Sequence, residues 1–140
     1  MPKNLIESLG TVGYDNLINS NVPVADVFTA KIRGLAAKPT YKRGTVLAFS
    51  SGTAGDNKLV ILGTEAAENE TLTPNCILAE DVTLDSGDTF AIAYRTGHFN
   101  RNALLFAEEY TFTDADEEAL RNAGILLSDA VDYIPAYEEE

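Results

Sequence analysis

The sequence predicts a β-rich α+β domain: a small mixed barrel or sandwich with one short helix and an extended N-terminal arm. Short segments that alternate apolar and polar residues recur between turns rich in Gly, Asn and Asp, a pattern typical of antiparallel strands. A single segment near the C-terminus carries the start and stop signals of a helix. The chain has 140 residues, of which 45% are apolar and 23% charged. A chain of this size and composition can bury one core of its own.

Residues 1–22 predict an arm rather than a regular element. Their apolar residues follow neither helical nor strand spacing for long, and Gly10 and Gly13 interrupt any helix. Two interpretations stay open: a frayed terminus, or a segment that orders against a partner. The many large apolar groups favour the second. The core domain is then expected to span residues 23–134, followed by an acidic tail at 135–140.

Strands are expected through most of the core domain. The expected segments are residues 24–32, 41–49, 58–62, 75–82, 89–94 and 125–131. The polar loop at 50–57 predicts a local antiparallel hairpin, and residues 65–74 predict an acidic, turn-like connection. Residues 93–104 combine Gly97, two Asn residues and an aromatic residue, and predict a strand, a tight corner and a second strand.

Residues 114–123 predict the one helix. Thr113 is a good N-cap, and Asp116 stands three residues later, close to a capping-box arrangement. Acidic residues fill the first turn, where the helix dipole favours negative charge. Gly124 fits the left-handed position that ends a helix. The residues expected to face inward are Ala119, Leu120 and Ala123.

The sequence offers little for catalysis, and we expect a protein that is not an enzyme. Cys76 is the only cysteine, lies in an apolar segment and is expected to be buried. His98 is the only histidine and is expected to bond a backbone carbonyl in the corner, with a subunit interface as the alternative. One Cys and one His cannot form the usual zinc site, so neither metal nor cofactor is expected. A pair of catalytic carboxylates remains open at this stage.

The formal net charge is −12, which disfavours binding to nucleic acid or to anionic membranes. No apolar run approaches the roughly 20 residues of a membrane span, and the N-terminus lacks the pattern of a secretory leader. We therefore expect synthesis in a cytoplasm and a partner surface that is neutral, basic or apolar.

Several motifs resemble the head decoration protein D family of tailed bacteriophages. The matching segments are Tyr14–Ile18, Val22–Val24, Lys42–Ala48, Leu78–Val82, Tyr94–Asn100 and Leu120–Leu127. Their order and spacing make the combination more specific than any single motif. The chain departs from the best-known lambdoid member in its greater length, its acidic tail and its lack of tryptophan, which leaves the details of trimer packing open.

The resemblance implies a small β-rich α/β domain that forms homotrimers on the outer surface of the expanded phage head. Its partner would be the major capsid protein, at three-fold positions, where it stabilises the shell against packaged DNA. Alternatives are a tail-tube or fibre-associated β domain, or a small ligand-binding or enzymatic barrel. The residues expected to contact the capsid are Leu5, Ile6, Val12, Tyr14, Leu17, Ile18, Val24, Val27 and Phe28.

Overall fold

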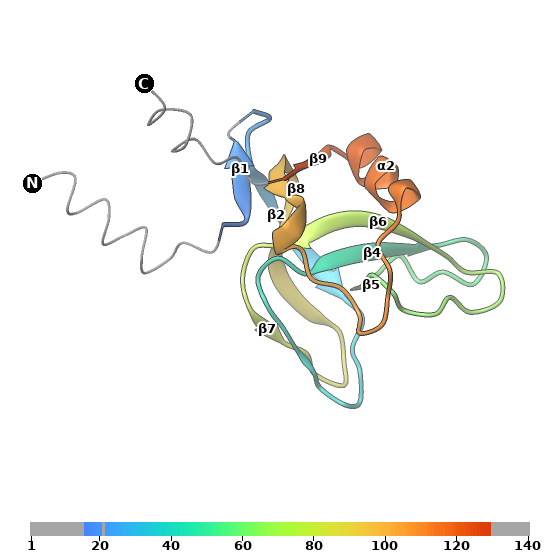
Figure 1. Cartoon of the computed structure of the whole chain (residues 1–140). Coiled ribbons are helices and arrows are strands. Elements are labelled where there is room, and N and C mark those ends of the chain that lie inside the picture. Colours follow the sequence, from blue (N-terminus) through green and yellow to red (C-terminus); the bar gives the residue numbers. More distant parts are fainter. Residues whose placement is uncertain (1–15, 21, 130–140) are drawn as a thin grey trace, which may run out of the picture.

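The computed structural model describes residues 16–20 and 22–129 (Figure 1). Nine strands, a 3-10 helix and an α-helix make up this part of the chain. Their bounds are β1 Ile18–Ser20, β2 Asp26–Ile32, β3 Thr40–Tyr41, β4 Val46–Ser51, β5 Leu59–Ile61, β6 Thr71–Leu78, β7 Val82–Thr83, β8 Thr89–Asn100, η1 Arg101–Ala103, α2 Asp114–Ala123 and β9 Ile125–Ser128.

Five strands close into a mixed barrel in the order β8-β2-β5-β4-β6, and a further pairing between β6 and β8 closes the ring. β2 and β5 run parallel, whereas the other neighbours in the barrel are antiparallel. The predicted β-rich α+β fold is confirmed, and of the two predicted forms the structure is a barrel.

The alternation of side chains along the strands creates two apolar layers. On β4, Leu47 points into the barrel, whereas Val46 and Ala48 face outward toward α2 and the segment that precedes it. β6 does the same with Cys76 inside and Ile77 outside. The barrel interior is filled by side chains, as expected for a ring of so few strands. The outer layer buries the inward face of α2 on β6 (Figure 1).

The second half of β8 extends beyond the barrel and forms a small sheet with the two ends of the described chain. β1 pairs with it antiparallel, at Ile18↔Phe99 and Ser20↔His98, and β9 pairs with it in parallel. Figure 1 shows β1, β8 and β9 side by side at one end of the molecule. Residues 16–20, which the sequence assigns to the arm, therefore belong to the fold.

The corner predicted within residues 93–104 lies later than expected, because β8 continues without a break from Thr89 to Asn100. Gly97 has φ +148°, and a Cβ placed there would lie 2.6 Å from the ring of Phe99. The glycine therefore makes room for a buried aromatic ring instead of forming a turn. The chain turns at η1, where the side chain of Asn100 accepts a hydrogen bond from the backbone N–H of Asn102.

The predicted connection at 65–74 is partly wrong. Residues 71–74 belong to β6, which pairs with β4 as far as Ser51↔Thr71, and β6 ends at Leu78 instead of reaching residue 82. Strand pairing extends this segment beyond what its polar residues indicate.

The helix is confirmed at residues 114–123. Thr113 and Asp116 form a full capping box, and Gly124 ends the helix with φ +113°. The buried face consists of Asp116 and Leu120, one turn apart. The inward placement of Ala123 is wrong: it is exposed, because the packed part of α2 is its first two turns.

Candidate partner-binding surfaces

An exposed apolar surface lies on the outside of β2 and the first half of β8. We call Val27, Thr29, Phe90 and Ile92 the β2–β8 face. The strand register places Thr29 opposite Ile92 and Val27 opposite Tyr94, so these side chains are neighbours on one side of the sheet. Phe90 is 63% exposed, Val27 44% and Ile92 36%. This exposure is unusual for large apolar residues on two adjacent strands.

Ion pairs lie at both ends of the β2–β8 face. Arg95 Nε lies 2.7 Å from Asp26 Oδ2 at one end. At the other end, Asp88 Oδ2 lies 2.9 Å from Lys58 Nζ and 3.8 Å from Lys31 Nζ. The rim of the face therefore carries both signs of charge, although the chain as a whole is strongly acidic.

The point where residues 1–15 join the fold is held by several bonds to β8 and β9. We call residues 16–20 the arm root. Leu17 is 1% exposed, and its carbonyl accepts a 2.7 Å hydrogen bond from the backbone N–H of Asn100. The Asn100 side chain donates to the carbonyl of Asn16. Asn19 Nδ2 donates to Ser128 Oγ at 2.8 Å, which ties β1 to β9.

His98 lies in β8 and not in a turn. Its Nε2 atom forms a 2.8 Å hydrogen bond with Ser128 Oγ, the atom that also accepts from Asn19. The expected bond from His98 to a backbone carbonyl is thus replaced by a side-chain bond that joins all three strands of the small sheet.

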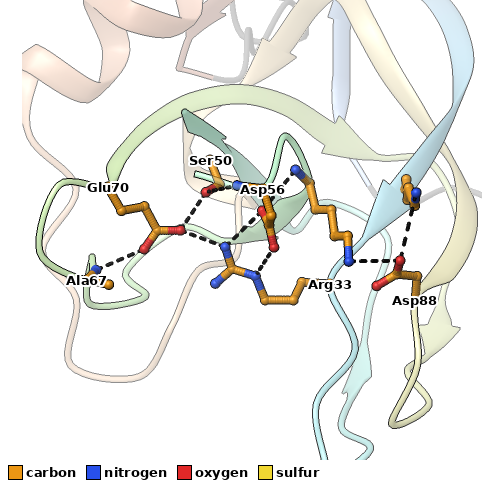
Figure 2. A network of polar contacts seen from close by, with 8 residues as sticks. Arg33, Ser50, Asp56, Ala67, Glu70 and Asp88 are labelled. Atoms are coloured by element: carbon orange, nitrogen blue, oxygen red, sulfur yellow. Dashed lines mark hydrogen bonds and ion pairs between the residues drawn. The ribbon is translucent and has the colours of Figure 1, made fainter. Parts of the chain in front are cut away.

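A polar network ties two loops to one end of the barrel (Figure 2). Arg33 donates to both carboxylate oxygens of Asp56, at 2.8 and 3.0 Å, and to Glu70 Oε2 at 2.6 Å. Glu70 also accepts from the hydroxyl of Ser50 and from the backbone N–H of Ala67. Its side chain is only 4% exposed. Arg33 therefore connects the loop that follows β4 to the loop that precedes β6.

These bonds favour the charged forms. The hydrogen bond from Arg33 lowers the pKa of Asp56 to about 2, and the N–H of Ala67, the hydroxyl of Ser50 and Arg33 together lower the pKa of Glu70 to about 2. Because both folded-state pKa values lie below the unfolded values near 4, the stabilisation is present above about pH 4. It is lost as the pH falls toward 2.

Replacing Arg33 by methionine should lower the melting temperature at pH 7 by several degrees, since it leaves the nearly buried Glu70 without its cation. The fall in melting temperature between pH 4 and pH 2 should also become shallower, because Arg33 is the largest cause of the lowered pKa of Asp56. The matched control is Arg121→Met, which removes an exposed pair with Glu118 and should change little. Parallel pH profiles for Arg33→Met and wild type, measured by circular dichroism, would refute this role.

The residues expected to contact the capsid occupy different environments. Those outside the described part of the chain are Leu5, Ile6, Val12 and Tyr14. Leu17 is a core residue, so its apolar side chain is used in folding, and Ile18 packs partly against the same cluster. Phe28 is half-buried against the barrel interior and so faces the core. Val24 and Val27 are exposed and accessible to a partner.

The sequence predicts Phe90 and Ile92 only as part of a strand and not as surface residues. The available signal was the order of sizes in Phe90-Ala91-Ile92-Ala93, in which large and small apolar residues alternate. The side chains inside the barrel are the two alanines, 3% and 0% exposed.

Cys76 is not placed to act as a reactive thiol. Cys76 is 0% exposed, and burial raises the pKa of its thiol to about 12, which keeps it protonated at neutral pH. Within residues 16–20 and 22–129, no three His, Cys, Asp or Glu side chains are grouped to hold a metal ion. In the same part of the chain, no helix is long and apolar enough to cross a membrane.

Comparison with protein families gives the identity of this barrel. Residues 25–126 match the family model described as bacteriophage lambda head decoration protein D. The chain belongs to this family. Head decoration proteins are structural components of the phage capsid, so the fold serves a capsid decoration role. The match covers the barrel and α2 but begins after β1, so the arm root lies outside it. A search of curated proteins found no match.

Proposed function

We propose that this decoration protein binds the outer surface of the expanded phage head as a trimer at three-fold sites and stabilises the shell against the pressure of packaged DNA. Its partner is the major capsid protein, which residues 1–15 contact as an extended arm. The arm root is the observation that carries this proposal, because it anchors the base of that arm in the core of a compact domain.

An anchored arm can transmit load. A pull on residues 1–15 acts on Leu17, which is buried, and on the hydrogen bonds from β1 to β8 and β9. An extended segment can add a strand to a sheet edge of the capsid subunit, where main-chain bonds supply affinity. Three arms from one trimer then combine through effective concentration, so weak single contacts give tight binding.

The interior of the barrel supports a structural role over a ligand-binding one. Its centre is occupied by close-packed side chains of the protein itself. The fully buried large residues there are Ile32, Leu47 and Leu78. Ligand-binding barrels instead leave room for a guest among their inward side chains. We therefore propose a protein that works through its outer surfaces, without catalysis.

The experiment compares phage particles assembled with and without the decoration protein. Purified chain added to expanded, undecorated particles should saturate at one trimer per three-fold site. Decorated particles should retain full-length DNA at higher temperatures and after treatment with chelator, measured by nuclease sensitivity and electron microscopy. Particles that tolerate heat and chelator equally well without the chain would contradict the proposed function.

A further inference from the structure

The β2–β8 face reverses the usual distribution of apolar residues on a barrel strand. In a strand with one buried side, the larger apolar residues normally face the core. In β8 the core side carries Ala91 and Ala93, whereas Phe90 and Ile92 face outward. The interior has no space for larger groups here, because Ile32 and Leu78 fill it from the adjacent strands. Folding of the barrel therefore does not account for a phenylalanine and an isoleucine on the outside.

Elsewhere on the outside of the barrel, the apolar side chains are covered by other parts of the chain. The apolar outward side chains of β4, β5 and β6 belong to the outer apolar layer, which α2 and the segment that precedes it cover. The outer side of β2 and the first half of β8 stays exposed in the described part of the chain. Phe90 lies at one end of this apolar patch, opposite Lys31 of the charged rim. An exposed aromatic residue in an apolar patch that borders on charged groups has the form of a protein–protein contact.

We propose that the β2–β8 face is the contact between copies of this chain in the trimer. This inference rests on the proposed function, since it assigns the surface by which that trimer forms. The charges of the chain indicate how a second copy can bind at this face. Copies that each carry a net charge of −12 repel one another unless they meet where the charge is balanced.

The rim of the face provides that balance. Asp26 is paired with Arg95 and Asp88 with Lys31 and Lys58, so a second copy brings both signs to the contact and can exchange ion pairs across it. The acidic first turn of α2 lies over β6 and is not part of this face (Figure 1). An acidic chain can therefore pack against its own copies here without bringing the acidic helix ends together.

The position of the face also suits a trimer with arms. The face follows β8 from Phe90 to Tyr94, the residue opposite Val27, and these lie eight and four residues from His98, which pairs with Ser20 of the arm root. At about 3.3 Å per residue these separations are roughly 26 and 13 Å along the strand. Copies can thus touch through their β2–β8 faces while each arm root stays accessible to the shell.

A photo-crosslinking experiment identifies what covers the face. Phe90 is replaced by p-benzoylphenylalanine, which keeps an exposed aromatic group, and the chain is irradiated on particles and in concentrated solution. The expected product has twice the 15.1 kDa mass of the chain, with the link mapped to a second copy. The same label at Leu105, which is 43% exposed and lies outside β2 and β8, should give far less of this product. A link only to the capsid protein, a link within one chain, or no link in either setting would overturn the proposal.

A second measurement tests the contribution to affinity. Phe90→Ser should weaken self-association, followed by analytical ultracentrifugation and by occupancy of particles, roughly tenfold or more, whereas Leu105→Ser should not. Equal weakening by both variants, or none by Phe90→Ser, would overturn the assignment. Retention of wild-type chain on particles is scored separately. Loss of retention would contradict the proposed function, while a chain-to-chain link formed in solution would still support this contact.

Discussion

Replacing Phe99 by alanine should destabilise the folded chain by about 3–5 kcal/mol, the largest loss expected from a single core truncation here. Phe99 is 0% exposed, and its ring centre lies 5.2 Å from that of Tyr94. The ring occupies the space left by the missing side chain of Gly97 and packs in the cluster that contains Leu17. Its removal leaves a cavity beneath the arm root. Urea denaturation followed by circular dichroism measures the effect.

The matched control is Phe90→Ala, the same substitution in the same strand. Phe90 is 63% exposed, so its truncation should cost about 1 kcal/mol or less when the protein is dilute enough to be monomeric. Similar losses for the two variants would show that the second half of β8 is not packed as the structure has it.

The helix shows which features can be predicted from local sequence. Its N-cap at Thr113, the acidic residue at 116 and the stop at Gly124 interact within a few residues of one another, so their geometry does not depend on the rest of the fold. The hairpin of β4 and β5 was predictable for the same reason: a short polar loop joins two apolar segments that pair locally.

The path of β8 could not be predicted in this way. Gly97 and Asn100 are typical turn residues, and only the buried ring of Phe99 and the arm root explain their place in a strand. The parallel pairings of β2 with β5 and of β8 with β9 join segments far apart in the chain. Pairing of this kind depends on the whole fold and leaves little trace in local periodicity.

The candidate surfaces show the same limit. Leu17 and Val24 are apolar residues in neighbouring, irregular segments, yet one is 1% exposed and the other 71%. Composition gives no means of separating them, because the difference arises from the strand that covers Leu17. Phe90 and Ile92 become noticeable only when the register shows that the alanines between them face the core.

Removing residues 1–15 should abolish the retention of the chain on particles without altering the fold. The truncated chain keeps Leu17, β1 and the bonds from Asn19 and Asn100, so its urea midpoint should match that of the wild type. Its binding to particles should fall roughly 100-fold or more, because a trimer without arms loses three linked contacts. Sedimentation of mixtures with undecorated particles measures the loss. Normal binding by this truncation would contradict the proposed role of the arm.

A longer truncation separates anchoring from binding. Removing residues 1–20 also takes away Leu17, a loss comparable to a core truncation of about 2–5 kcal/mol, and exposes the side of β8 that β1 covers. This variant should lose stability as well as binding, whereas the shorter one loses binding alone. A full-length chain in which Leu5, Ile6, Val12 and Tyr14 are changed to serine should behave like the shorter truncation if apolar anchors supply the affinity. If the serine variant binds as the wild type does, main-chain pairing alone holds the arm to the shell.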